Sequence, residues 1–316
     1  MIAVGLLPIQ LSAELQLAQP TVKTDSFDKN IQRVFADDQL ADVRVIFGYD
    51  NNKDYMSPSD PVRARNLMAY LTRKSFKNIE ITEDLAANLG VTVNAQNLRV
   101  FEGPGLPGQT LRVSLIWSSA TLSTAKNVGS ERALQYRCSY EALKFMQKAA
   151  SDAEVHVYLG HSRAGGGPDT FPPVTLNNIA GDRQQVDYSH YRAQPGLKAL
   201  ESYFLKSKAT PYFILWTSCA TERHFRSWFS RVLSTKRLPT NLVLSTRITE
   251  HIPEQDQIEG RDEGLMVVIR LLEALQKHES RHAFEERIKT CEMEFRHDPL
   301  KPAWKLIALP GDRTAR

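Results

Sequence analysis

Short apolar runs alternate along this chain with longer segments in which apolar positions recur at helical spacing. Runs rich in β-branched and aromatic residues predict strands at residues 42–49, 78–83, 154–161, 211–219 and 242–246. Helical patterns occupy residues 61–74, 130–150, 195–208 and 222–233, and a long helix is expected to begin near Asp262. Residues 97–117 hold two β-rich runs around a Gly/Pro cluster, which predicts a hairpin.

The order of these elements predicts an α/β fold. A strand, a helix and a further strand imply a right-handed crossover between parallel strands. We therefore expect a three-layer α/β/α sandwich with an open, mostly parallel sheet, built as one domain from residues 41–280. Residues 1–40 would precede it as an arm or a signal-like segment, and residues 281–316 would follow it. In that last part we expect the end of a helix and, from Asp298 on, a Pro-containing tail laid over the surface.

The first residues leave the cellular compartment open. The chain is apolar up to Leu11 and then meets the small pair Ser12-Ala13, like the core and end of a secretory signal, but the positively charged start is missing. An N-terminal arm packed on the domain is the alternative. No apolar run is long enough to span a bilayer, so a soluble protein is expected, exported if the segment is a signal.

Composition limits the partners. The 316 residues are 42% hydrophobic and 24% charged with a net charge of +4, and basic residues alternate with acidic ones. Nucleic acid is therefore not expected to bind, because that needs a concentrated basic surface. Three cysteines, Cys138, Cys219 and Cys291, form no C-x-x-C pair, and an odd number leaves at least one without an intramolecular partner. Cys138 falls on the apolar stripe of its helix and is expected in the core.

Two residues capable of chemistry stand where predicted strands end. His161 closes the strand at 154–161 and Cys219 closes the strand at 211–219. Ligands of open α/β sheets bind outside the carboxyl ends of the strands, so both residues are expected at one rim. A neighbouring imidazole stabilises a thiolate, and a helix beginning near Glu222 would add a favourable dipole. His224, in the first turn of that helix, is a less natural alternative base.

Two other catalytic motifs compete with this pair. Gly160-His161-Ser162 resembles the nucleophile elbow of serine hydrolases, but the following Gly- and Pro-rich residues cannot form the helix that an elbow requires. His278-Glu279-Ser280-Arg281-His282 matches the H-E-x-x-H pattern of zinc peptidases, with His278 and His282 as ligands. It has no evident third ligand among Glu285, Glu286, Glu292 and His297, so a polar helix end is the favoured interpretation.

An apolar strand ending in His161 before small residues, and a second ending in Ser218-Cys219, resemble the caspase/legumain/gingipain superfamily of cysteine peptidases. The resemblance covers roughly residues 42–275, with His after the third strand and Cys after the fourth. It implies an endopeptidase in which Cys219 attacks a peptide carbonyl, His161 serves as acid and base, and the N–H groups of Ser162 and Cys219 hold the oxyanion. Ser162 stands where the family usually has Gly. Thr217-Ser218 replaces the usual acidic residue or Gln followed by Ala, so a non-catalytic binding domain of the same fold is the alternative.

The loop after His161 is the expected substrate contact. Gly165 and its neighbouring glycines would let a substrate backbone pass, while Asp169 would recognise a basic side chain or Arg163 an acidic one. The same glycines with Arg163 are also compatible with a nest for phosphate or carboxylate. Residues 187–191 would lie near the same rim as a polar loop. No dinucleotide fingerprint or Walker loop occurs, so no cofactor is expected; the substrate would be a protein or peptide, and the oligomeric state stays open.

Overall fold

The computed structural model describes residues 26–50, 59–176, 185–207, 210–247, 251–252, 261–295 and 302–309. They form an α/β protein with one open, mixed and mostly parallel sheet of eight strands. The strands of this sheet are β1 Leu40–Phe47, β2 Lys77–Asn78, β3 Leu98–Pro104, β4 Thr110–Trp117, β5 Val155–Leu159, β6 Phe213–Trp216, β7 Thr240–Ser245 and β10 Trp304–Leu309. A separate ribbon pairs β8 His251–Ile252 with β9 Arg261–Asp262.

The spatial order of the sheet is β10-β7-β6-β5-β1-β4-β3-β2. The five central strands, from β7 to β4, are parallel. β10 joins one edge antiparallel to β7, while β3 and β2 extend the other edge. The predicted hairpin at residues 97–117 is confirmed as β3 and β4. The strand parallel to β1 on this side is β4, whereas the expected crossover led to residues 78–83.

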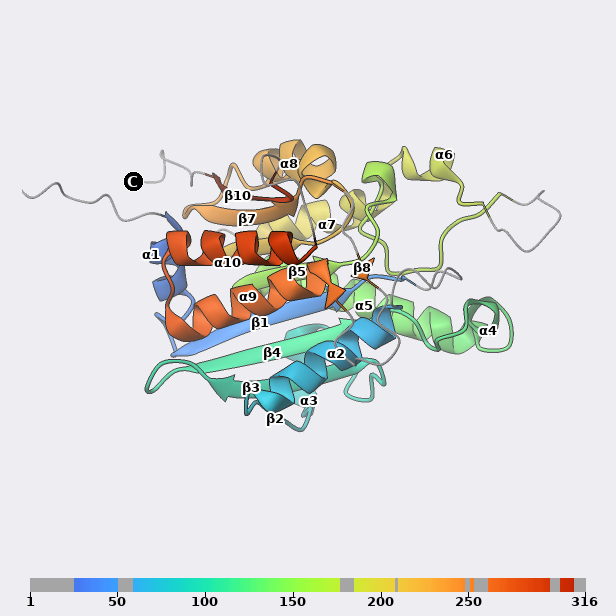
Figure 1. Cartoon of the computed structure of the whole chain (residues 1–316). Coiled ribbons are helices and arrows are strands. Elements are labelled where there is room, and N and C mark those ends of the chain that lie inside the picture. The colour runs from blue at the N-terminus through green and yellow to red at the C-terminus, as the bar shows by residue number, and fades with distance from the viewer. Residues whose placement is uncertain are drawn as a thin grey trace, which may run out of the picture.

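Helices flank the sheet (Figure 1). One face is covered by α1 Ser26–Arg33, α2 Asp60–Arg73, α9 Glu263–Lys277 and α10 Arg281–Glu294, and the other by α3 Glu83–Leu89, α5 Arg132–Asp152, α7 Pro195–Lys206 and α8 Thr221–Val232. Short α4 Thr124–Val128 and α6 Tyr188–Tyr191 lie on the side toward which β1 and β4 point.

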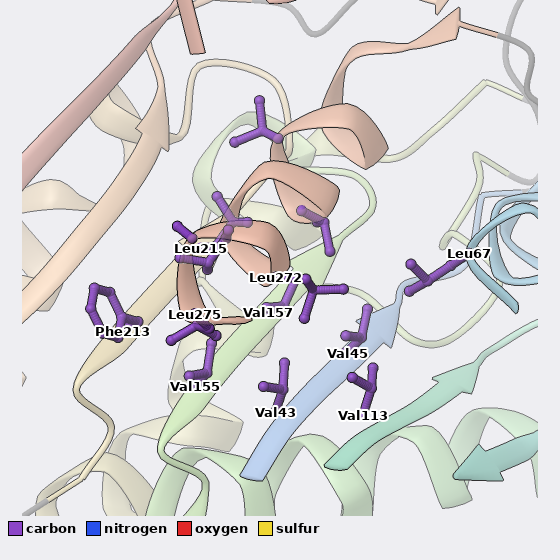
Figure 2. Close-up of a cluster of buried hydrophobic side chains, with 14 of the residues drawn as sticks. Val43, Val45, Leu67, Val113, Val155, Val157, Phe213, Leu215, Leu272 and Leu275 are labelled. Atoms are coloured by element: carbon purple, nitrogen blue, oxygen red, sulfur yellow. The ribbon is translucent and has the colours of Figure 1, made fainter. Parts of the chain in front are cut away.

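Alternation along the strands divides the apolar side chains between two cores. Val43 and Val45 of β1 face α2 and α9, where they join Leu67 and Leu272 in a cluster of buried hydrophobic side chains (Figure 2). Ile46 faces the opposite way, into a second cluster containing the side chains of α5, α7 and α8. A strand with both faces buried reads as a nearly continuous apolar run, which is why the central strands were recognisable from the sequence.

The strand predicted at residues 78–83 is wrong. The strand comprises only Lys77–Asn78, and the chain leaves the sheet after the N–H of Ile79 donates to the carbonyl oxygen of Val100 in β3 at 2.9 Å. Ile79 and Ile81 alternate as in a strand, but they pack against the second core from an irregular segment. The hydroxyl of Thr82 accepts the N–H of Leu85 at 3.2 Å and begins α3, so the polar end of this run is a helix cap.

The expected surface tail is also wrong for the part of the C-terminus that the structure describes. Trp304–Leu309 form β10 in the main sheet, and α10 packs against α9 as a complete helix. At the other end, Phe27 and Ile31 of α1 are buried in the first core. The signal-like residues lie outside the described residues. No helix in the described ranges is long and apolar enough to cross a membrane.

Candidate active site

His161 and Cys219 follow neighbouring strands at the same rim. β5 and β6 are parallel, and Tyr158 pairs with Trp216 in their register. His161 lies three residues beyond Tyr158, and Cys219 lies three residues beyond Trp216, so both belong to the loops at the carboxyl ends of adjacent strands. The loops that carry His161 and Cys219 therefore follow adjacent strands at one edge of the sheet, as the sequence predicts.

A buried carboxylate fixes one side of the His161 ring. Nε2 of His161 lies 3.0 Å from Oδ1 of Asp50, which follows β1, the other neighbour of β5. Asp50 is buried, whereas the side chain of His161 is 24% exposed. When the hydrogen of the neutral ring is on Nε2, that nitrogen donates to Asp50 and Nδ1 is the basic nitrogen. Asp50 thus selects the tautomer and orients the ring.

Asp50 belongs to a buried ionic chain. Its Oδ2 lies 2.5 Å from Nη1 of Arg63, and Nε of Arg63 lies 2.6 Å from Oδ2 of Asp262. Burial alone would raise the pKa of Asp50, but the charges of His161 and Arg63 outweigh it and hold the pKa well below its ordinary value. Asp50 therefore stays ionised beside the His161 ring.

Asp60, the first residue of α2, ties two neighbouring strand ends together. Its carboxyl oxygens accept the N–H groups of Asp50 at 3.2 Å, Ser118 at 2.8 Å and Ser119 at 2.6 Å, as well as the Ser119 hydroxyl. Burial raises the pKa of Asp60 to about 7, although the hydrogen bonds from Ser119 act in the opposite direction. This hub fixes the backbone of Asp50 and thereby the position of its carboxylate.

Hydroxyl groups hold the turn that carries Cys219. Thr221 Oγ1 donates to the carbonyl of Trp216 at 3.0 Å and lies 2.9 Å from Ser245 Oγ, which donates in turn to the carbonyl of Ser218. Ala220 has a φ of 50°, a left-handed conformation that is unfavourable for alanine. Strained backbone of this kind persists where the surroundings fix it, often at functional sites.

The three cysteines differ sharply in their surroundings. Cys219 is partly exposed, whereas Cys138 and Cys291 are buried, and none of the three forms a disulfide. Burial raises the pKa of the Cys138 thiol to about 11, which makes it inert at neutral pH. The expectation that Cys138 belongs to the core is confirmed by its burial. Only Cys219 combines access to solvent with a position at the rim.

Arg163 and Asp169 pair with each other, 3.1 Å apart, and both side chains are buried. The hydroxyl of Tyr191 also donates to Oδ2 of Asp169, at 2.9 Å. Both charges have partners within the protein, and selection of a charged substrate side chain by either of them stays a prediction. Their role is to shape the loop beside His161.

The glycines of this loop serve close packing. Gly165 has a φ of 93° in the short helix η1 Arg163–Gly165, and a side chain there would approach the ring of His224. A Cβ on Gly166 would lie 2.4 Å from the carbonyl oxygen of Tyr191. The loop is folded tightly against its neighbours, so Gly165 and Gly166 serve packing within the protein, and contact of this loop with a substrate backbone stays a prediction.

Ser162 does not stand on a nucleophile elbow. Its φ and ψ are −78° and −19°, and a three-residue η1 follows in place of the helix that an elbow requires. The side chain is buried. Because these dihedrals are allowed for any residue, Ser replaces Gly here without strain. Within the described ranges, the N–H groups of Ser162 and Cys219 donate to no protein acceptor.

The H-E-x-x-H pattern is split between two helices. His278 caps α9 with a φ of 50°, and α10 begins only at Arg281. The His278 ring stacks on Phe35, and its Nε2 lies 2.8 Å from Oε1 of Gln109. The alternative of a zinc site on one helix is therefore wrong, and His278 lies at a helix end, as the favoured interpretation expects. No group of three His, Cys, Asp or Glu side chains in the described part of the chain is arranged to hold a metal ion.

Other predicted rim residues have structural partners. Asp187 caps α6 by accepting the N–H of Ser189 at 2.9 Å, and Tyr191 anchors Asp169 as described above. His224 packs beside Gly165, and its pKa is lowered first by burial and then by the charge of Arg223. These contacts make residues 187–191 and His224 supports of the loop.

Sequence reasoning missed Asp50, Arg63 and Asp262. A carboxylate directly after the first buried strand was the available indication for Asp50, since strand ends share one rim. Arg63 and Asp262 lie within or beside predicted helices, and their mutual contacts depend on tertiary structure.

Comparisons of the chain with protein-family models, curated proteins and solved structures found no match.

Proposed function

We propose that this protein is a cysteine endopeptidase of caspase-like type. Cys219 is the nucleophile, His161 is the general base and acid, and Asp50 positions His161. The observation that carries this proposal is the 3.0 Å contact between His161 and buried Asp50, made at the rim where partly exposed Cys219 ends the adjacent strand. Nucleophile, base and orienting carboxylate are the three groups that this chemistry needs.

The order of the strands supports the caspase-like assignment. In chain order the parallel strands are β1, β4, β5, β6 and β7, with β3 antiparallel to β4 on one side and β10 antiparallel to β7 at the other edge. His161 follows the third parallel strand and Cys219 follows the fourth, as the resemblance to the superfamily implies. Helices on both faces agree with the three-layer arrangement of that fold.

In the proposed first half-reaction, Nδ1 of His161 takes the proton of Cys219, and the thiolate attacks the carbonyl carbon of the scissile peptide. A C–S bond forms and the carbonyl oxygen becomes an oxyanion. Ionised Asp50 stabilises the imidazolium that results. When the carbonyl is restored, the C–N bond breaks, and His161 returns its proton to the leaving amine. The product is a thioester on Cys219.

In the second half-reaction, water replaces the amine. His161 takes a proton from the water, whose oxygen attacks the thioester carbonyl, and the C–S bond breaks. The acid product leaves, and Cys219 regains its proton. The N–H groups of Ser162 and Cys219, which have no described protein acceptor, are the proposed donors to the oxyanion in both steps. Ser in place of the usual Gly at position 162 retains that donor.

Peptide cleavage tests the proposal. The protein is incubated with a mixed-sequence peptide library, and new termini are identified by mass spectrometry. We expect cleavage that Cys219→Ala abolishes and that Cys138→Ala, a matched change in a buried cysteine, retains. Cleavage that survives Cys219→Ala would falsify the assignment of the nucleophile. Complete absence of cleavage together with specific peptide binding would favour the non-catalytic binding domain.

A further inference from the structure

One buried hydroxyl group joins the second core to the candidate site. Tyr158 of β5 is fully buried, and its ring packs on Trp216 of β6 with the two ring centroids 5.5 Å apart. A phenylalanine would supply the same packing, so the hydroxyl group needs an explanation of its own. A buried hydroxyl is stable only when it has hydrogen-bond partners.

The partners of this hydroxyl belong to the loop that carries His161. Tyr158 donates to the carbonyl oxygen of His161 at 3.1 Å, with that of Asp169 further away at 3.4 Å, and it accepts the N–H of Asp169 at 3.0 Å. Both partners are main-chain groups of an irregular segment, where a side chain replaces the bonds that a strand partner makes in a sheet. Burial raises the pKa of Tyr158, so the hydroxyl keeps its proton and remains a donor.

The same contacts extend to the strand end that carries Asp50. The carbonyl oxygen of Asp169 accepts the N–H of Tyr49, the residue before Asp50, at 2.9 Å. Asp169 therefore bonds to Tyr158 through its N–H and to Tyr49 through its carbonyl group. His161 and Asp50, whose side chains meet at 3.0 Å, are thus joined a second time through the main chain.

Two glycines make room for the Tyr158 hydroxyl. Gly48 follows β1 and Gly160 follows β5. A Cβ at either position would collide with the hydroxyl oxygen, at 2.5 Å in the case of Gly160. The hydroxyl is therefore closely packed between the two strand ends that carry Asp50 and His161.

We infer that Tyr158 is a positioning residue, which fixes His161 against Asp50 through the main chain of their two loops. Reacting groups are held in place by supports of this kind, which lie behind them and are themselves locked by packing. The inference rests on the proposed function for its consequence at Cys219. Its effect on the His161 ring does not depend on catalysis.

Tyr158→Phe tests the inference, because it removes the hydroxyl and keeps the ring on Trp216. The tautomer of His161 is measured by long-range proton–nitrogen NMR of protein labelled at histidine, at a pH where the ring is neutral, and His161→Ala identifies the signal. We expect a single tautomer with its hydrogen on Nε2 in the unmodified protein and a mixture of two in Tyr158→Phe. His278, whose Nε2 lies 2.8 Å from Oε1 of Gln109, is the internal reference.

The consequence for the proposed peptidase is measured at Cys219. Alkylation by iodoacetamide at pH 6 should be about fivefold slower in Tyr158→Phe, the factor that corresponds to one hydrogen bond, and little changed at pH 9. Tyr70→Phe is the matched control, because it also removes a buried phenol hydroxyl, which donates to Glu273 at 3.2 Å in the first core. This control should change neither the tautomer of His161 nor the pH profile.

The two measurements separate this inference from the proposed function. A mixture of tautomers already in the unmodified protein, an unchanged tautomer in Tyr158→Phe, or the same change in Tyr70→Phe overturns the inference. If Cys219 of the unmodified protein is inert at every pH, the peptidase proposal fails, and the tautomer of His161 alone decides the role of Tyr158.

Discussion

At the scale of single residues, the proposed mechanism depends on Asp50, which orients the His161 ring. Asp50 and Asp262 both contact Arg63, but only Asp50 also contacts His161. The charges of His161 and Arg63 hold the pKa of Asp50 below its ordinary value, so Asp50 is an ionised carboxylate beside the His161 ring. Asp262 instead caps α9 by accepting the N–H of Leu265 at 2.8 Å, so changes at the two aspartates separate an effect on His161 from an effect on packing.

We predict that Asp50→Asn slows alkylation of Cys219 by iodoacetamide about tenfold at pH 6 and little at pH 9, because thiols ionise unaided near pH 9. The measurement is the alkylation rate as a function of pH. Asp262→Asn is the control and should leave the shape of the pH profile unchanged. Equal profiles for both variants would show that Asp50 has only a structural role.

Glu154 provides an independent test far from the site. Burial raises its pKa to about 9, assisted by the nearby carboxylates of Asp37, Asp42 and Asp38, although the N–H of Asp42 opposes the shift. The unfolded chain loses this proton near 4.5 and the folded chain near 9. Stability from the protonated group is therefore complete below pH 4.5 and is lost as pH rises toward 9.

We predict that Glu154→Gln removes this loss. Between pH 5 and pH 8, the free energy of unfolding of the unmodified protein should fall by roughly 3 kcal/mol more than that of the variant. Urea unfolding at the two pH values measures the difference. The same pH dependence in both proteins contradicts a protonated Glu154.

At the scale of elements, the segment after His161 was correctly predicted as a loop, but its close packing against Tyr191 and His224 was not predicted. The Gly and Pro residues excluded a helix there, which was correct, yet their close approach to Tyr191 is set by α6 and could not be predicted from local sequence. Likewise, Ile79 and Ile81 follow the period of a strand while packing from an irregular segment. Periodicity identifies buried positions and does not decide whether a hydrogen-bonding partner strand is available.

We predict that Gly166→Ala displaces this loop. The new methyl group would lie 2.4 Å from the carbonyl oxygen of Tyr191, so the backbone beside His161 must shift. Overpacking of this kind costs about 1–3 kcal/mol. The thermal midpoint should fall, and Cys219 alkylation at pH 6 should slow. Gly108→Asn, at the tip of the β3–β4 hairpin with nothing within 4 Å, should change neither measurement.

At the scale of the whole molecule, β10 forms one edge of the sheet and stabilises the start of α9, near the ionic chain of Asp50. Trp304 of β10 is buried in the first core, and its indole N–H donates to Glu263 at the start of α9. Neighbouring Asp262 ends the ionic chain that begins at Asp50. The prolines of this region suggested a surface tail. The pairing of β10 with β7 could not be predicted from local sequence, because it joins residues far apart in the chain.

We predict that Trp304→Ala lowers the free energy of unfolding by about 3–5 kcal/mol, as expected for truncation of a buried aromatic side chain. Chemical denaturation measures the change. Lys305→Ala, in the same strand but exposed, should change stability by less than about 0.5 kcal/mol. A small effect of Trp304→Ala would mean that β10 contributes little to the folded domain.

The central claim is that His161 activates Cys219, and the most direct measurement is the pH dependence of cysteine alkylation. Native protein is treated with iodoacetamide and each cysteine is followed by peptide mapping, with buried Cys138 and Cys291 as internal references. We predict that Cys219 reacts at pH 6, well below the ordinary thiol pKa of about 8.5, and that His161→Ala removes this reactivity. An inert Cys219, or the same profile in His161→Ala, would contradict the account.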